Sequence, residues 1–396
     1  MKKVVLAFSG GLDTSYCAIY LAKDLGYEVH SVAVNTGGFD ADEVDALATK
    51  AKELGSEHHT CLDVEQRFYN DGIRYLLYGN VLKNHSYPLS VSAERVFQAM
   101  AIVQHAKSIG ADAIAHGSTG AGNDQVRFDL VFQIMAPDME IITPIRDLKL
   151  SREQEVEYLK KHGIHKSWDK AKYSINKGLW GTSVGGAETL SSHLALPEFA
   201  WPTPMSKNES HRIELVFKEG EPIGLNGQKM SPVQLIKALN ELAAPYGIGR
   251  DHHVGDTIIG IKGRVGFEAA APVLLIQAHR VLEKHTLAKW QLYWKDQMGE
   301  WYGMMMHEGQ YLDPVMRDIE AFLSSTQKRV TGSVYIRLNR GYFEVLGIES
   351  KYDLMQSPAG QYGEMNDGWT GEDVKGFTKI MSNATHIFKG MEKDHD

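Results

Sequence analysis

The stretch SGGLDTS, residues 9–15, places two glycines among four polar side chains near the amino terminus. An apolar run at residues 3–8 precedes it, and a helical pattern follows it. Glycines let backbone N–H groups come close to an anion, and the start of a helix adds a partial positive charge. The alternative is a plain strand–turn–helix connection. The number of polar donors favours a phosphate site.

This loop differs from the two common nucleotide loops. It has no lysine, as G-x-x-x-x-G-K-[ST] requires, and it does not fit G-x-G-x-x-G. It resembles the pyrophosphate loop, S-G-G-x-D-[ST]-S, of the N-type ATP pyrophosphatases. That resemblance implies cleavage of ATP between its α and β phosphates. The loop would hold the departing pyrophosphate, which explains why a lysine for the γ-phosphate is absent.

A second glycine-rich loop begins HGSTGAGNDQVRFDL, residues 116–130, after the apolar run 111–115. Asn123 and Arg127 lie four residues apart at the start of the next helix and share a face. Arg127 can bind a carboxylate through two N–H groups, and Asp124 can meet an ammonium group. Both signs of charge in one pocket suit an amino-acid substrate. An ion pair between Asp124 and Arg127 within the helix remains an equally good interpretation of these residues alone.

Together the two loops resemble those of the argininosuccinate synthase family, whose second loop follows H-G-[AS]-T-x-K-G-N-D. Three further matches extend the resemblance along most of the chain. They are Tyr87 and Ser92 in YPLSVS, Ser174 and Ser183 in YSINKGLWGTS, and Glu268 in GRVGFEAAAP. The resemblance implies that ATP, carried with Mg²⁺, drives the condensation of citrulline with aspartate. A citrullyl adenylate forms on the way, and AMP and pyrophosphate are released.

The resemblance also implies a role for each matching residue, with no metal held by the protein alone. The residues assigned to ATP are Ala7, Phe8, Ser9, Gly10, Gly11, Leu12, Asp13, Thr14, Ser15, Val34 and Gly117. Those assigned to aspartate are Thr119, Asn123 and Asp124. Those assigned to citrulline are Tyr87, Ser92, Asn123, Arg127, Ser174, Ser183 and Glu268. Asp13, Asp124 and Arg127 are the catalytic candidates.

Three positions depart from the family pattern. Ala121 replaces a lysine of the second loop, Gly178 replaces an asparagine, and Ile276 stands where a citrulline-contacting tyrosine is expected. Two of these concern the citrulline pocket, so an N-acylated citrulline stays open as an alternative acceptor. A non-catalytic sensor of adenine nucleotides is the alternative from a different functional class. Such a sensor would release no pyrophosphate.

The elements that position these loops alternate between strand and helix over the first part of the chain. We expect strands at 3–8, 28–34, 57–62 and 111–115, with amphipathic helices between them. This order predicts an α/β, doubly wound parallel sheet that binds the nucleotide. Beyond a Gly-, Ser- and Pro-rich crossover at 165–210, antiparallel hairpins and a helix opened by Ser231 and Pro232 predict an α+β domain.

The carboxyl-terminal segment has a separate pattern. A seam with steps of three and four predicts a helix that starts near Thr370. The seam consists of Val374, Phe377, Met381, Ala384, Phe388 and Met391. We expect this arm to pack on a neighbouring subunit of a homotetramer, although packing on its own domain is nearly as plausible. The predicted domains are residues 1–165, 166–365 and 366–396.

Composition excludes several classes of protein. The 396 residues are 43% apolar, which suffices for sizeable cores, but no apolar run approaches the roughly 20 residues that span a bilayer. A net charge of −8 argues against nucleic acid as the main partner. Two isolated cysteines fit a reducing, cytoplasmic setting.

Neighbouring histidines such as His58 and His59 point to opposite sides of a strand and cannot share a metal.

Overall fold

The computed structural model describes residues 1–166, 168, 172–360, 362–364 and 368–393. The chain divides into two compact units, residues 1–350 and 351–396. The predicted boundary between residues 365 and 366 lies outside the described residues, and the three-domain division stays a prediction. In the part of the chain that the structure describes, no helix is long and apolar enough to cross a membrane.

Five parallel strands form the sheet of the first half of unit 1, in the order β3-β2-β1-β4-β5. The strands are β1 (Lys3–Ala7), β2 (Glu28–Asn35), β3 (His58–Asp63), β4 (Ala113–Ala115) and β5 (Glu140–Ile142). The order reverses direction at β1, so the loops after β1 and β4 meet at the carboxyl edge of the sheet, where open α/β sheets bind ligands. The predicted doubly wound fold is confirmed.

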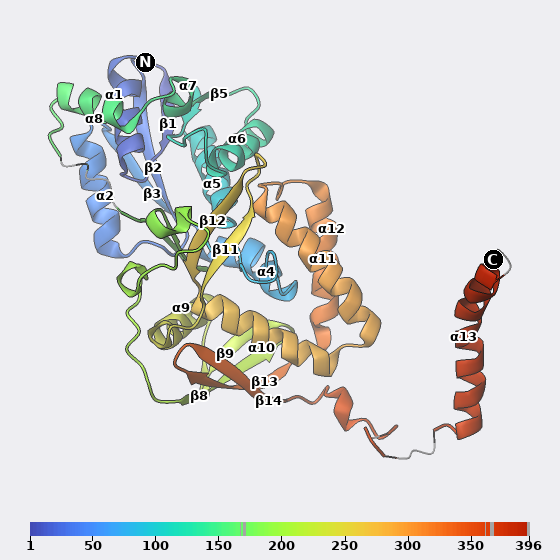
Figure 1. Cartoon of the computed structure of the whole chain (residues 1–396). Helices are drawn as coiled ribbons and strands as arrows, with labels where there is room; N and C mark the ends of the chain where they lie inside the picture. The colour runs from blue at the N-terminus through green and yellow to red at the C-terminus, as the bar shows by residue number, and fades with distance from the viewer. Residues whose placement is uncertain (167, 169–171, 361, 365–367, 394–396) are drawn as a thin grey trace. The chain divides into compact units, whose positions relative to one another are not determined.

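Helices cover both faces of this sheet because the strands are apolar on both sides. The helices are α1 (Leu12–Lys23), α2 (Ala41–Glu53), α3 (Glu65–Phe68), α4 (Arg74–Tyr78), α5 (Glu94–Ser108), α6 (Asp124–Met135), α7 (Pro144–Asp147) and α8 (Arg152–Lys161), with a π-helical turn at Tyr69–Ile73. Val4 and Leu6 of β1 pack in one core with residues of α1 and α8. Val5 lies in the other core with residues of α5 and α6. Figure 1 shows α1 and α8 on one side of the parallel strands and α5 and α6 on the other.

The second half of unit 1 holds two antiparallel sheets, ordered β10-β9-β8-β13-β14 and β11-β12-β7-β6. The strands are β6 (Ser174–Gly178), β7 (Gly181–Gly185), β8 (His211–Lys218), β9 (Glu221–Leu225), β10 (Gln228–Lys229), β11 (Arg250–Asp256), β12 (Lys262–Glu268), β13 (Gly332–Asn339) and β14 (Tyr342–Glu349). The helices are α9 (Pro232–Ala243), α10 (Ala270–Thr286), α11 (Lys289–His307) and α12 (Pro314–Thr326). Short 3₁₀ turns lie at Ala187–Leu190, Glu198–Ala200, Ala244–Tyr246, Gln327–Arg329 and Leu354–Gln356.

The predicted hairpins β8–β9 and β13–β14 are confirmed, and so is the predicted start of α9. Ser231 Oγ accepts from the Gln234 N–H at 3.4 Å, and the Gln234 side chain accepts from the Ser231 N–H at 3.2 Å. The hairpin β6–β7 differs from the expectation, since the sequence of the crossover gave no strand pattern. Unit 2 contains the expected terminal helix, α13 (Gly371–Lys393).

Candidate active site

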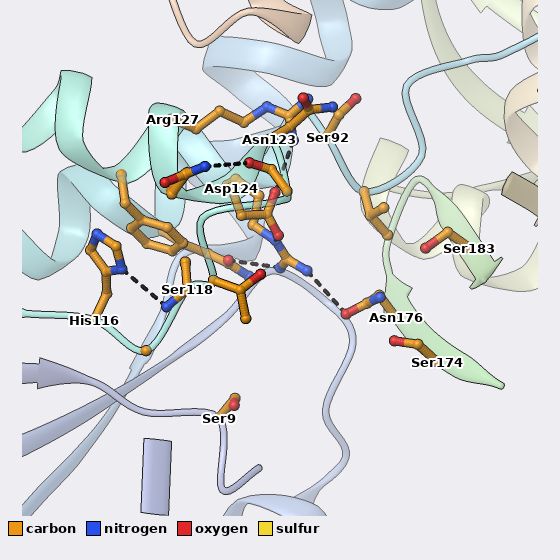
Figure 2. Close-up of a pocket in the computed structure, with 18 of the residues that line it drawn as sticks. Ser9, Ser92, His116, Ser118, Asn123, Asp124, Arg127, Ser174, Asn176 and Ser183 are labelled. Atoms are coloured by element: carbon orange, nitrogen blue, oxygen red, sulfur yellow. Dashed lines mark hydrogen bonds and ion pairs between the residues drawn. The ribbon is translucent and has the colours of Figure 1, made fainter. Parts of the chain in front are cut away.

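A cavity of about 800 Å³ opens along the carboxyl edge of the parallel sheet. The loops after β1 and β4 form one wall. Residues of the β6–β7 hairpin and of β11 and β12 also line it. Figure 2 shows Ser174 and Ser183 on the hairpin, across the cavity from Asn123, Asp124 and Arg127 of the second loop and α6. The two loops that the sequence singled out are thus parts of one site.

The first loop leaves the amino end of α1 open to the cavity. Gly10 has a φ of +70°, and a Cβ there would lie 2.8 Å from Leu47, so the turn requires glycine. Gly11 is the N-cap residue and supplies no side-chain cap. Ser15 Oγ donates to the Gly11 carbonyl at 2.7 Å, and Ser9 Oγ lies 3.4 Å from Thr14 Oγ1. The N–H groups and hydroxyls of this turn suit an anionic group.

The second loop lies directly against the first. A Cβ on Gly117 would come within 3.2 Å of the Asp13 carbonyl carbon and the Thr14 nitrogen, so a side chain there would crowd the first loop. Buried His116 fixes the loop, because its Nδ1 accepts from the Ser118 N–H at 3.1 Å. Its Nε2 therefore carries the proton and donates to Asp129 Oδ1 at 2.8 Å. Arg146 Nη1 also donates to Asp129, at 2.6 Å.

Two arginines hold Asp124 from both sides. Arg127 Nη1 donates to Asp124 Oδ1 at 2.8 Å, and Arg95 Nε donates to Oδ2 at 3.1 Å. Burial alone would raise the pKa of Asp124, but Arg95 and then Arg127 lower it below its ordinary value. The ion pair between Asp124 and Arg127 that the sequence left open is therefore present. This ion pair uses only part of the hydrogen-bond donors of Arg127.

One nitrogen of the Arg127 guanidinium has no hydrogen-bond partner among the described residues. Its Nε donates to the His307 carbonyl at 2.8 Å, while its buried Nη2 has no hydrogen-bond partner among the described residues. Ser92 Oγ, also buried and also on the cavity lining, lacks a partner in the same sense. Leaving a buried donor unpaired costs about 1–3 kcal/mol. Two such groups at one cavity indicate a polar ligand that satisfies both.

Two neutral imidazoles stand on the side of the cavity near Arg127. Burial, and then Lys83, lowers the pKa of His253 to about 4. Burial, and then the charges of Arg127 and Lys83, lowers the pKa of His307 to about 2. His253 stacks on Tyr87, with ring centroids 4.8 Å apart. Both rings are uncharged at neutral pH, so positive charge on this side comes from Arg127 and Lys83.

The structure brings most of the assigned residues to the cavity, but it places Glu268 elsewhere. The residues on the lining are Ala7, Phe8, Ser9, Gly11, Leu12, Asp13, Thr14, Val34, Tyr87, Ser92, Gly117, Thr119, Asn123, Asp124, Arg127, Ser174 and Ser183. Gly10 and Ser15 are buried in the first loop. Glu268 is buried and absent from the described cavity lining, and its Oε2 accepts from Arg250 Nε at 3.0 Å. Its assignment to citrulline stays a prediction.

The three departures from the family pattern fall in different surroundings. Ala121 is exposed in the second loop. Ile276 is 1% exposed in the core of α10 and is absent from the described cavity lining. A Cβ on Gly178 would lie 2.2 Å from Glu94 Oε2, so Glu94 fills the space that a longer residue at 178 would need.

Several cavity residues escaped the sequence reasoning. Arg95 and Asn176 are joined at 3.2 Å and link α5 to the β6–β7 hairpin. His253 and His307 come from β11 and α11. None of the four belongs to a spaced motif with the residues it contacts. His253 belongs to the histidine pair at 252–253, but nothing in that pair indicates its contact with Tyr87.

Comparison with known proteins adds independent findings. Residues 3–165 match the arginosuccinate synthase N-terminal HUP domain, and residues 173–388 match the arginosuccinate synthase C-terminal domain. The argininosuccinate synthase of Methanocaldococcus jannaschii is 41% identical over 353 residues, which cover 88% of this chain and 89% of that protein. The argininosuccinate synthase of Dictyoglomus thermophilum is 36% identical over 399 residues, 99% of both chains.

Proposed function

The chain belongs to the argininosuccinate synthase family, and from this premise we propose that it joins citrulline to aspartate using ATP. The ureido oxygen of citrulline attacks the α-phosphorus, the bond to the β-phosphate bridging oxygen breaks, and pyrophosphate leaves. The amine of aspartate then attacks the ureido carbon and loses a proton. The carbon–oxygen bond to the nucleotide breaks, which releases AMP and argininosuccinate.

The first loop is proposed to hold the phosphates of ATP. The uncapped start of α1 and the hydroxyls of Ser9 and Thr14 support this role, because they offer donors to negative oxygens without a covalent step. Val34 and Gly117 line the same cavity and are assigned to the nucleotide. Mg²⁺ is proposed to arrive with ATP. Asp13 is the loop carboxylate on the cavity lining that suits it.

Citrulline is proposed to place its α-carboxylate at Arg127, and this observation carries the proposal. The unpaired Arg127 Nη2 and Ser92 Oγ are both donors, and a carboxylate can accept from both. Tyr87, Ser174 and Ser183 line the adjoining wall with hydroxyl groups that suit the uncharged ureido group. The neutral imidazoles of His253 and His307 add no competing charge.

Aspartate is proposed to bind at Thr119, Asn123 and Asp124. Asn123 Oδ1 accepts from the Ile258 N–H at 2.8 Å, which orients the amide so that Nδ2 can donate to a carboxylate. The carboxylate of Asp124 is held by two arginines, and its remaining lone pairs can accept from an ammonium group. The two loops thus offer neighbouring places for ATP and aspartate.

The test is an assay with ATP, aspartate, citrulline and Mg²⁺. We expect AMP and pyrophosphate in equal amounts, and none when citrulline is omitted. ADP as the product would contradict the assignment, and a protein that binds ATP but releases no pyrophosphate would be a sensor.

The same assay with N-acetylcitrulline decides the acceptor. Free citrulline is favoured because neither Gly178 nor Ile276 opens space: Glu94 fills the one place, and the other lies in a core. Glu268 is the proposed carboxylate partner of the α-ammonium group of citrulline, but it already pairs with Arg250. An acylated amine carries no charge and needs no such partner, so this pairing is the observation that favours N-acetylcitrulline. Faster turnover of N-acetylcitrulline would establish the modified substrate.

The assembly is proposed to be a homotetramer in which α13 packs on a neighbouring subunit. Support comes from its apolar side chains, since Phe377, Met381 and Phe388 are all more than 60% exposed. A cytoplasmic location is proposed as well. It is supported by Cys17 and Cys61, which are free cysteines, and burial raises the pKa of the Cys17 thiol.

A further inference from the structure

A second cluster of ligand-type side chains lies at the amino edge of the parallel sheet, at the other end of the strands from the cavity. His30 of β2 pairs with His58 of the edge strand β3. Glu28 precedes His30 by two residues, so both side chains point to the same face. His59, the neighbour of His58 along the strand, points to the opposite face. The relevant partner lies across the sheet.

The three side chains converge on one point. His30 Nε2 lies 2.9 Å from Glu28 Oε1, and His58 Nε2 lies 3.5 Å from the same oxygen. The two imidazole rings are stacked, with centroids 4.4 Å apart and planes within 10°. One ligand atom from each of the three residues lies within 4.8 Å of the other two.

The surroundings leave the cluster open to an ion from solvent. The exposed fractions of the side chains are 13% for His30, 33% for Glu28 and 53% for His58. The partial burial of His30 limits its movement, and the exposure of His58 provides access. His105 of α5 is near enough for its pKa, lowered first by burial, to be lowered further by His30.

We propose that Glu28, His30 and His58 bind a divalent transition-metal ion, with zinc as the best fit. Two imidazole nitrogens and one carboxylate oxygen are a preferred donor set for zinc, and water completes the tetrahedron. A cation there bonds β3 to β2, so it stabilises the edge strand of the sheet. The site is remote from the two glycine-rich loops and takes no part in the condensation.

The first test measures zinc binding by calorimetry, using the full chain after treatment with a chelator. We expect one zinc ion per chain. His58→Ala, at the most exposed of the three positions, should weaken binding by more than about tenfold. His211→Ala removes an exposed histidine at the start of β8 and should change nothing. Equal affinity in the parent and His58→Ala, or no binding by the parent, would overturn the proposal.

The second test reports the ligands without using activity. Co²⁺ in place of zinc should give the intense visible absorption of a four-coordinate site in the parent. The absorption should be lost in Glu28→Gln, which keeps the shape of the side chain but removes its charge. Zinc should also raise the melting temperature of the parent and not that of His58→Ala. Unchanged cobalt spectra in Glu28→Gln and His58→Ala would rule out these ligands.

Discussion

At the scale of single residues, the site depends on which hydrogen-bonding groups are already in use. Arg127 illustrates this. Two of its three nitrogens are engaged by Asp124 and the His307 carbonyl, and the third is buried without a partner in the described part of the chain. The engaged groups fix the guanidinium plane, and the remaining nitrogen belongs to a residue of the cavity lining. The same residue therefore stabilises the fold and is the proposed partner of the citrulline carboxylate.

The first prediction concerns Arg127→Lys. Lysine keeps the charge but loses the planar fork, so we expect KM for citrulline to rise by more than about tenfold. KM for ATP should change by less than about threefold, because the nucleotide contacts remain. Steady-state kinetics with each substrate varied in turn provide the measurement.

Two further variants distinguish a lost contact with citrulline from misfolding of the protein. Ser92→Ala removes the second unpaired donor without disturbing Asp124 and should also raise KM for citrulline. Arg337→Lys, at an exposed position in β13, should leave both constants unchanged. If Arg127→Lys and Ser92→Ala bind citrulline as the parent does, the carboxylate does not lie there.

The second prediction concerns Glu94, whose pKa burial raises to about 7. Its stabilising contribution is complete below the ordinary pKa and is lost as the pH rises through the folded value. Glu94→Gln cannot ionise. We therefore expect the unfolding free energy of the variant, relative to the parent, to rise between about pH 4.5 and 7 and then to level off. Urea unfolding across this range measures the difference, and a difference that is flat with pH would refute the raised pKa.

At the scale of elements, α5 and the β6–β7 hairpin share one boundary. Thr36 Oγ1 donates to Glu94 Oε2 at 2.8 Å, and the absent side chain of Gly178 leaves room for that carboxylate. Arg95 bonds Asn176 on the same hairpin. The hairpin that carries Ser174 and Ser183 is thus positioned by Glu94 and Arg95 at the start of α5, two and three residues after Ser92. The departure at Gly178 is a packing feature shared by two elements.

The third prediction tests this packing. Gly178→Asn forces side-chain atoms into Glu94, so we expect a loss of about 1–3 kcal/mol in unfolding free energy. Glu94→Ala removes the obstacle, and the double variant should regain part of that loss as a favourable coupling. Gly347→Asn is the control, because nothing lies within 4 Å of a Cβ at that strand position. Additive effects of Gly178→Asn and Glu94→Ala would contradict the shared boundary.

The sequence could predict elements whose signal is local. The period of α9, its Ser231 cap and the strands around both glycine-rich loops all depend on nearby residues. The β6–β7 hairpin was missed because its stability comes from pairing with β12 and from packing on α5. Strands that are rich in glycine and serine, as this one is, lack the alternation on which a sequence pattern depends.

The residues of the candidate site also fall into those that the sequence could predict and those that it could not. Residues in contiguous motifs, such as Asp13, Asn123 and Arg127, could be named from spacing and resemblance. Arg95 could not, since its partner Asp124 is 29 residues away in the chain. The pairing of Glu268 with Arg250 also required coordinates, because the motif around Glu268 says nothing of which side chain reaches it.

At the scale of the whole molecule, every described residue of the cavity lining belongs to unit 1. Unit 2 consists mainly of the amphipathic helix α13. Among the described residues of unit 2, none covers the seam of α13, where Phe377, Met381, Phe388 and Met391 are all exposed. A single apolar face of this length is unfavourable in water, so it needs another surface. The second copy of the chain is the occupant that the family resemblance suggests.

The final prediction concerns this assembly. Phe377→Gln combined with Phe388→Gln replaces two seam side chains without shortening the helix, and we expect the mass in solution to fall below that of the parent oligomer. Light scattering after gel filtration measures it. Lys379→Gln with His386→Gln changes two exposed residues off the seam and should preserve the parent mass. Because the cavity is built within unit 1, a dissociated variant that still binds ATP would separate the assembly role of α13 from the nucleotide site. Parent mass in the seam variant would place the helix on its own subunit.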